Sequence, residues 1–260
     1  MFKQHRKKLL KLSSGIILYE WLLTGVYPVI AENPAVTEIA EAFPSAVKTV
    51  FGVSAQARVD TFEAFISAQF FARIWTPLMA IYGINMANAL LAELVDNGSL
   101  VFPLSTPVSR ADILITQAAV LVSSNSILIA ATLAGLSSGA FVFGIELNHR
   151  QYLRLGVLGF AFLSVIGGYS LLFSAWFAEE ERALAYAYGL TFAFYALDVI
   201  GGLTDKLSWA RHLSLFHLFK PQEVLEGTKN PFGAIIGLTS GAAILLALAT
   251  KVFEGKDLAL

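Results

Sequence analysis

The sequence predicts an all-helical integral membrane protein with about six transmembrane helices. Hydrophobic residues make up 56% of the chain and charged residues only 14%, whereas a soluble domain carries about 25% charged residues. Several apolar stretches of about 20 residues are long enough to cross a hydrocarbon core about 30 Å thick. The strongly alternating segments of about ten residues that are typical of an outer-membrane barrel are absent from the sequence. Helices therefore account for the membrane-spanning part.

The N-terminal segment, residues 1–12, is basic and is expected to form a cytoplasmic or interfacial lead-in to the first span. Its basic residues are Lys3, Arg6, Lys7, Lys8 and Lys11. By the positive-inside rule, such a cluster stays on the cytoplasmic side. The apolar run that follows, residues 13–31, has the length of a full span, so we expect it to be a membrane helix and not a cleaved signal peptide.

Five further spans complete a transmembrane domain over residues 13–251. They are predicted at residues 61–94, 113–136, 153–177, 183–203 and 231–251. Pro77 is expected to kink the second span, because proline removes a backbone hydrogen bond. Outer loops are expected over residues 32–60, with short surface helices, and over residues 204–230. The tail, residues 252–260, then lies on the cytoplasmic side with the N-terminus. Orientation depends on the N-terminal cluster, since the other basic residues do not favour one side.

No motif for catalysis, metal binding or nucleotide binding appears in the sequence. The phosphate loop G-x-x-x-x-G-K-[ST], the zinc motif H-E-x-x-H and the nucleophile elbow G-x-S-x-G are all absent. The chain has no cysteine and only four histidines, which fall in terminal or loop segments. The net charge of −1 gives no basic surface for nucleic acid. We therefore expect neither an enzyme nor a chain that holds its own cofactor or metal.

Among the charged residues inside the predicted spans, the candidates for a functional role are Glu20, Glu63, Arg73 and Asp198. An ionised group at bilayer depth costs several kcal/mol, so it usually faces a partner or a water-filled path. Glu63 and Arg73 lie near the predicted outer interface, where long side chains can reach water. Glu20 and Asp198 lie deeper, and either a structural contact or a place on a transport path would explain each of them.

Small residues spaced by four mark one face of the sixth predicted span, at Gly233, Gly237 and Gly241. Such a face lets another helix backbone approach closely. Packing inside the helix bundle is the favoured interpretation, and a dimer seam is the alternative. The third span ends with the same spacing, at Ala131, Gly135 and Gly139.

The polar segment at residues 93–112, between the second and third predicted spans, carries the most informative pattern. It begins as ELVDNGSL from Glu93 and continues as LSTPVSR, which ends at Arg110. This resembles a motif of type-2 ABC transporter permeases, in which an acidic residue precedes a Gly-Thr-Leu-like turn and a Leu-Ser-x-Pro-Val-Ser-Arg run precedes the third span. Here Ser99 replaces the usual Thr. The six-span layout and the basic N-terminus extend the resemblance over most of the chain.

The resemblance implies that residues 93–112 hold a cytoplasmic coupling helix that docks on a separate ATP-binding cassette subunit. The residues implied in this contact are Glu93, Gly98, Ser105, Pro107 and Arg110. Arg110 would pair with an acidic surface of the partner, and Pro107 would fix the direction in which the segment leaves. ATP and Mg would bind to the partner subunit.

The function implied by the resemblance is that of a permease subunit of an ABC exporter. It would form a homodimer, or a heterodimer with a similar subunit, in the cell membrane, and two ATP-binding subunits would bind to it. Hydrophobic or amphipathic compounds or peptides are the expected substrates. One alternative is an ion-driven secondary transporter, although no internal repeat is visible and six spans are few for that class. A second alternative is a non-transporting membrane scaffold or enzyme subunit, which leaves residues 93–112 unexplained.

Overall fold

The computed structural model describes residues 2–31, 61–99, 108–177, 179–203 and 205–256, and every regular element among them is a helix. Six of these helical segments are long and apolar enough to cross a membrane. They are Arg6–Ile30, Phe62–Asp96, Arg110–Phe143, His149–Trp176, Glu180–Leu203 and Phe232–Glu254. The predicted fold class, an all-helical membrane protein with six spans, is confirmed. The outer loop predicted over residues 32–60 lies outside the described residues, as do residues 257–260 of the predicted C-terminal tail.

The first helix, α1, extends over Phe2–Ala31 without a break between the basic lead-in and the apolar run. No glycine or proline separates the two segments, and the Ser14 hydroxyl donates to the carbonyl of Leu10 within the helix (2.9 Å). The basic cluster therefore belongs to the same helix as the first span.

The second span consists of four consecutive helical pieces. α4 (Phe62–Ile66) leads into a π-helix, η1 (Ser67–Trp75), which is followed by α5 (Thr76–Leu90) and α6 (Ala92–Asp96). The π-helix ends two residues before Pro77, which lacks the N–H that an α-helix would donate to the carbonyl of Arg73. The Thr76 hydroxyl donates to the carbonyl of Phe71 (2.7 Å) and stabilises the wide turn. The disturbance expected at Pro77 thus lies beside a wide helical turn.

The remaining spans are single long helices: α8 (Arg110–Phe143), α9 (His149–Trp176), α10 (Glu180–Leu203) and α13 (Phe232–Glu254). α8 continues past the predicted end of the third span, because nothing interrupts the helix before Gly144. That glycine takes a positive φ of 70° and ends the helix. Between α10 and α13 the chain forms four short pieces, η2 (Asp205–Leu207), α11 (Ser208–Arg211), η3 (Phe216–Leu218) and α12 (Pro221–Leu225).

The helices divide into two compact units, and α8, α9 and α10 each contribute residues to both. The first unit comprises Met1–Leu78, Ile127–Gly159 and Phe194–Gly233. Aromatic rings fill its core: Phe70, Phe71, Trp75 and Phe219 lie in a row with ring centroids 5.0 to 5.6 Å apart. The second unit comprises Met79–Ser126, Phe160–Ala193 and Ala234–Leu260. Its core consists mainly of aliphatic side chains, among them Leu90, Leu91, Leu114 and Ala175, together with the ring of Phe253.

Candidate functional site

The N-terminal flank of the predicted coupling segment is tied to the start of α10. The side chain of Asp96, at the end of α6, accepts a hydrogen bond from the backbone N–H of Glu180 (3.2 Å). The Asn88 amide donates to the Glu180 carboxylate (2.9 Å). Backbone N–H groups at a helix start lack partners within the helix and favour negative charge. Asp96 therefore caps a helix to which it does not belong.

The turn after α6 leaves Glu93 and Gly98 exposed. Gly98 adopts a φ of 71°, a left-handed conformation that glycine takes without strain. The Asn97 side chain accepts from the backbone N–H of Ser99 (2.9 Å) and fixes the turn. Exposure of Glu93 agrees with the expected docking role. The other two predicted contact residues of the intervening stretch, Ser105 and Pro107, lie outside the described residues.

The C-terminal flank of the segment is tied to the end of α13. The Ser109 hydroxyl and the Asp112 carboxylate form a reciprocal cap that starts α8: the hydroxyl donates to the carboxylate (2.6 Å) and accepts from the Asp112 N–H (3.1 Å). Arg110 then donates to the backbone carbonyls of Lys256 and Glu254. A cation suits this position, because carbonyl groups at a helix end lack donors. The pairing of Arg110 with a partner's acidic surface stays a prediction.

Lys256, whose carbonyl accepts from Arg110, also connects the end of α9 to these contacts. Its ammonium donates to the carbonyl of Ala175, near the end of α9 (2.9 Å). Burial lowers the pKa of Lys256 below its usual value. In the second unit, therefore, basic side chains connect the start of α8 with the ends of α9 and α13.

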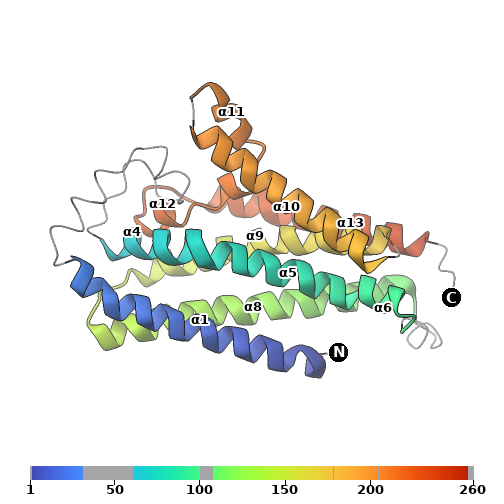
Figure 1. The fold of residues 1–260 in the computed structure, drawn as a ribbon, viewed down its shortest axis with the longest axis horizontal. Coiled ribbons are helices and arrows are strands. Elements are labelled where there is room, and N and C mark those ends of the chain that lie inside the picture. Colours follow the sequence, from blue (N-terminus) through green and yellow to red (C-terminus); the bar gives the residue numbers. More distant parts are fainter. Residues whose placement is uncertain (1, 32–60, 100–107, 178, 204, 257–260) are drawn as a thin grey trace. The chain divides into compact units, whose positions relative to one another are not determined.

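Glu20 lies at a close contact between α1 and the second half of α8, which run side by side in the first unit (Figure 1). Its side chain is 0% exposed, and a Cβ on Gly135 would overlap its Oε2 atom. One turn further along, Thr24 contacts Gly139, and the Trp21 indole donates to the Ser138 hydroxyl (3.0 Å). The small residues noted at the end of the third span thus permit close packing within the chain.

Asp198 is paired with residues from the loop that follows α10. Arg211 Nε lies 3.2 Å from the Asp198 carboxylate, and His217 Nδ1 lies 3.7 Å from the same oxygen. Gly201 makes room for the loop, since a Cβ there would lie 2.5 Å from Arg211 Cγ. The structure gives Asp198 a structural contact, and a place on a transport path stays a prediction. The sequence alone does not identify Arg211 as the partner of Asp198; the only signal is the group of basic residues soon after the span.

Desolvation by burial is the largest influence on the pKa of His217. It lowers the pKa of the imidazole, and the neighbouring Lys220, Arg211 and His212 lower it further, while Asp198 acts in the opposite direction. The ring of His217 lies 5.0 Å from that of His212. The neutral form of His217 is therefore favoured beside the Asp198–Arg211 pair.

The glycine face of α13 is bare among the described residues. A Cβ on Gly233, Gly237 or Gly241 would meet nothing within 4 Å. Large apolar side chains of the same helix, among them Ile236 and Ile244, are exposed. The expected packing inside the bundle is therefore not seen there, and the alternative, a dimer seam, stays a prediction.

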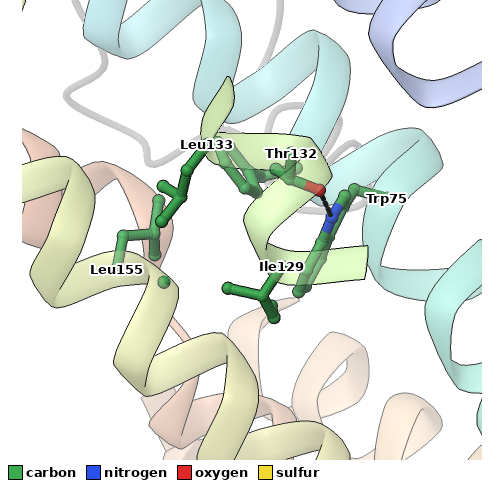
Figure 2. A pocket seen from close by; sticks show the side chains of 7 residues that line it. Trp75, Ile129, Thr132, Leu133 and Leu155 are labelled. Carbon is green, nitrogen blue, oxygen red and sulfur yellow. Dashed lines mark hydrogen bonds between the residues drawn. The ribbon is translucent and has the colours of Figure 1, made fainter. Parts of the chain in front are cut away.

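A small apolar cavity lies in the first unit and is shown in Figure 2. Its lining consists of Phe71, Trp75, Ile129, Thr132, Leu133, Leu155 and Gly156. The Trp75 indole donates to the Thr132 hydroxyl (3.0 Å), which satisfies the polar groups at its wall. The cavity has room for about one water molecule, so it is too small for a transported compound. Within the part of the chain that the structure describes, no group of three or more His, Asp or Glu could hold a metal ion.

Comparison with known proteins supports the resemblance noted in residues 93–112. The chain matches the model of a family described as ABC-2 family transporter proteins over residues 18–258. No curated protein matches the chain. The family match covers nearly the whole sequence, from within the first span to beyond the end of the sixth. The chain is thus a multi-pass membrane protein that belongs to the ABC-2 transporter family.

Proposed function

We propose that this chain is the permease subunit of an ATP-binding cassette exporter and works with a separate ATP-binding subunit. The family match over residues 18–258, together with the six spans, carries the proposal. ATP and Mg bind to the partner subunit, which performs the hydrolysis, and this chain holds no cofactor. Both termini lie on the cytoplasmic side, and transport is directed outward.

The contact with the ATP-binding subunit is made by residues 93–110. The exposed carboxylate of Glu93 supports this assignment on the side of α6. The two flanks of the segment bind to different helices, Asp96 to the start of α10 and Arg110 to the end of α13. If the partner moves this segment, the movement is therefore passed on to α10 and α13. These helices would then move as rigid elements between two arrangements. The residues assigned to this contact are Glu93, Gly98, Ser105, Pro107 and Arg110.

A second copy of the chain, or a similar subunit, completes the permease. The support is the low burial of α10 and α13. In an 18-residue apolar stretch of each span, only 11% of the residues are buried inside the chain. The glycine face at Gly233, Gly237 and Gly241 gives a backbone surface that another helix can approach. The transport path lies between the two copies. Hydrophobic or amphipathic compounds or peptides are the substrate class, in keeping with the apolar spans.

The proposal is tested by co-purification in mild detergent with the ATP-binding cassette subunit encoded beside its gene. We expect the two subunits to purify together with ATPase activity, and Glu93→Lys to weaken the complex at least about tenfold, or ~1.4 kcal/mol. The matched control is Glu226→Lys, the same charge reversal on an exposed side chain after α12. A chain that purifies alone, folded and without ATPase activity, contradicts the proposal. Equal effects of both substitutions contradict the assignment of the contact.

A further inference from the structure

The side chain of Glu20 occupies a position in which a carboxyl group is enclosed by protein. It lies halfway along α1, is 0% exposed, and faces Gly135 of α8. The backbone of Ile17 comes within 3.2 Å of the position that a Cβ on Gly135 would take. The two helices are therefore in backbone contact around the carboxyl group.

Three hydrogen-bond donors near Glu20 are engaged with other acceptors. The Thr24 hydroxyl donates to the backbone carbonyl of Glu20 (2.7 Å). The Trp21 indole donates to the Ser138 hydroxyl (3.0 Å), which itself donates to the carbonyl of Gly135 (3.1 Å). Neither carboxyl oxygen of Glu20 has a hydrogen-bond partner among the described residues. An ionised carboxylate can only accept hydrogen bonds, so its burial here would be uncompensated.

Charged groups on the elements packed against Glu20 do not compensate it either. On α1 the nearest basic residue is Lys11, nine residues away, or about 13 Å along the helix. On α8 the charged residues are Arg110 and Asp112, more than 20 residues from Gly135. α4 and η1 also contact α1; they carry Glu63 and Arg73, of which Arg73 donates to the Gln69 side chain (2.9 Å).

Two tyrosines are further titratable groups of α1, and both are engaged with aromatic rings. The ring of Tyr19 lies 6.2 Å from that of Phe70, and the ring of Tyr27 lies 5.2 Å from that of Phe62. A tyrosine hydroxyl stays neutral far above the pH at which a free carboxyl group ionises. The two rings therefore supply no positive charge to Glu20.

We propose that Glu20 is a proton-binding site, which holds a proton while α1 packs on Gly135 and Gly139 and releases it to water when the two helices separate. A proton suits this place, because it removes the charge and needs no volume beyond the carboxyl group itself. The step is a plain acid dissociation: the O–H bond of the carboxyl group breaks, and water takes the proton. This inference goes beyond the proposed function and needs no ATP-binding subunit.

The first test detects the proton directly by infrared spectroscopy of the full chain in lipid nanodiscs at neutral pH. We expect the difference spectrum of wild type minus Glu20→Gln to contain the C=O band of a protonated carboxyl group. The matched control is Glu63→Gln, on α4, which should lack this band. Loss of only carboxylate bands in Glu20→Gln would overturn the proposal. If that variant fails to fold, Glu20→Asp serves in its place, since it keeps the acid and shifts the band.

The second test asks whether helix separation controls the proton. The Cβ of Thr24 lies 3.5 Å from the position of a Cβ on Gly139, within the range of 3.5–4.5 Å that a disulfide requires. The chain has no cysteine of its own. The double variant Thr24→Cys, Gly139→Cys can therefore form a single defined disulfide between α1 and α8. We expect exchange of the Glu20 carboxyl proton in D₂O to be at least about tenfold slower with the disulfide closed than after its reduction. Equal rates would overturn the requirement for separation.

Discussion

The contact of α1 with α8 and the bare face of α13 show what one sequence pattern can and cannot specify. Both carry glycines four residues apart. At Gly135 and Gly139 the space is filled by Glu20 and Thr24 of α1, whereas a Cβ on Gly237 would meet nothing. The spacing therefore predicts a surface that permits close approach. The helix that uses it is determined by side chains elsewhere in the chain, or by another chain.

The largest effect on stability is expected from replacing a glycine by leucine at each of these two surfaces. Gly135→Leu should destabilise the protein by about 3 kcal/mol, because the new side chain overlaps Glu20 and the backbone of α1. Gly237→Leu places the same side chain in open space and should change the stability of the single chain by less than about 0.5 kcal/mol. Thermal unfolding in detergent measures both.

The same two variants also test whether the glycine face of α13 forms a dimer contact. If a second copy uses the face of α13, Gly237→Leu should lower the dimer fraction, which cross-linking in nanodiscs measures, while Gly135→Leu acts mainly on the stability of each chain. Equal destabilisation by the two variants would contradict the difference between the two surfaces.

A second prediction concerns the helix ends of the second unit. Arg110→Met keeps an unbranched apolar side chain but removes the donors to the carbonyls of Glu254 and Lys256. A loss of about 1–2 kcal/mol is expected, measured by denaturant or thermal unfolding. Arg182→Met is the control, because Arg182 forms an exposed pair with Glu179, and such pairs contribute little. Equal losses in the two variants would contradict the capping role of Arg110.

A third prediction concerns how the stability of the protein changes as the pH rises above about 4.3. The carboxyl group of Glu20 should be ionised in the unfolded chain above about pH 4.3, so folding takes up a proton at neutral pH. Stability should then decrease with rising pH in the wild type more than in Glu20→Gln. Parallel pH profiles of the two proteins would indicate that Glu20 is ionised in the folded state.

The smallest effect is expected on the acid side, at the loop after α10. Since desolvation and nearby cations lower the pKa of His217 in the folded protein, the unfolded chain takes up this proton first as the pH falls below about 6.5. The stability contribution is complete above that pH and is lost as the pH falls through the lowered pKa. His217→Gln should flatten the acid limb of the thermal stability profile, and His149→Gln, at an exposed position at the start of α9, should leave it unchanged.

The sequence was sufficient for the six spans, because bilayer thickness fixes the length of an apolar helix and leaves few alternatives. The motif in residues 93–110 was sufficient to indicate the family, which the family match confirms, whereas the docking role of this segment stays a prediction. The partner of Asp198 could not be identified from the sequence, since Arg211 returns to it only through the short pieces after α10. Nor could the bonds of Arg110 to the end of α13, since they join segments far apart in the chain. Pro77 predicts a disturbance of the second span but not its form, a wide helical turn.

The central claim, that residues 93–110 dock on an ATP-binding subunit, is tested most directly by cross-linking. The absence of cysteine in the chain allows Glu93→Cys to be labelled with a photoreactive thiol reagent in the co-expressed complex, with Glu226→Cys as the control. We expect a covalent adduct that contains the ATP-binding subunit at position 93 and none at position 226. No adduct at position 93 in a complex that retains ATPase activity would contradict the account.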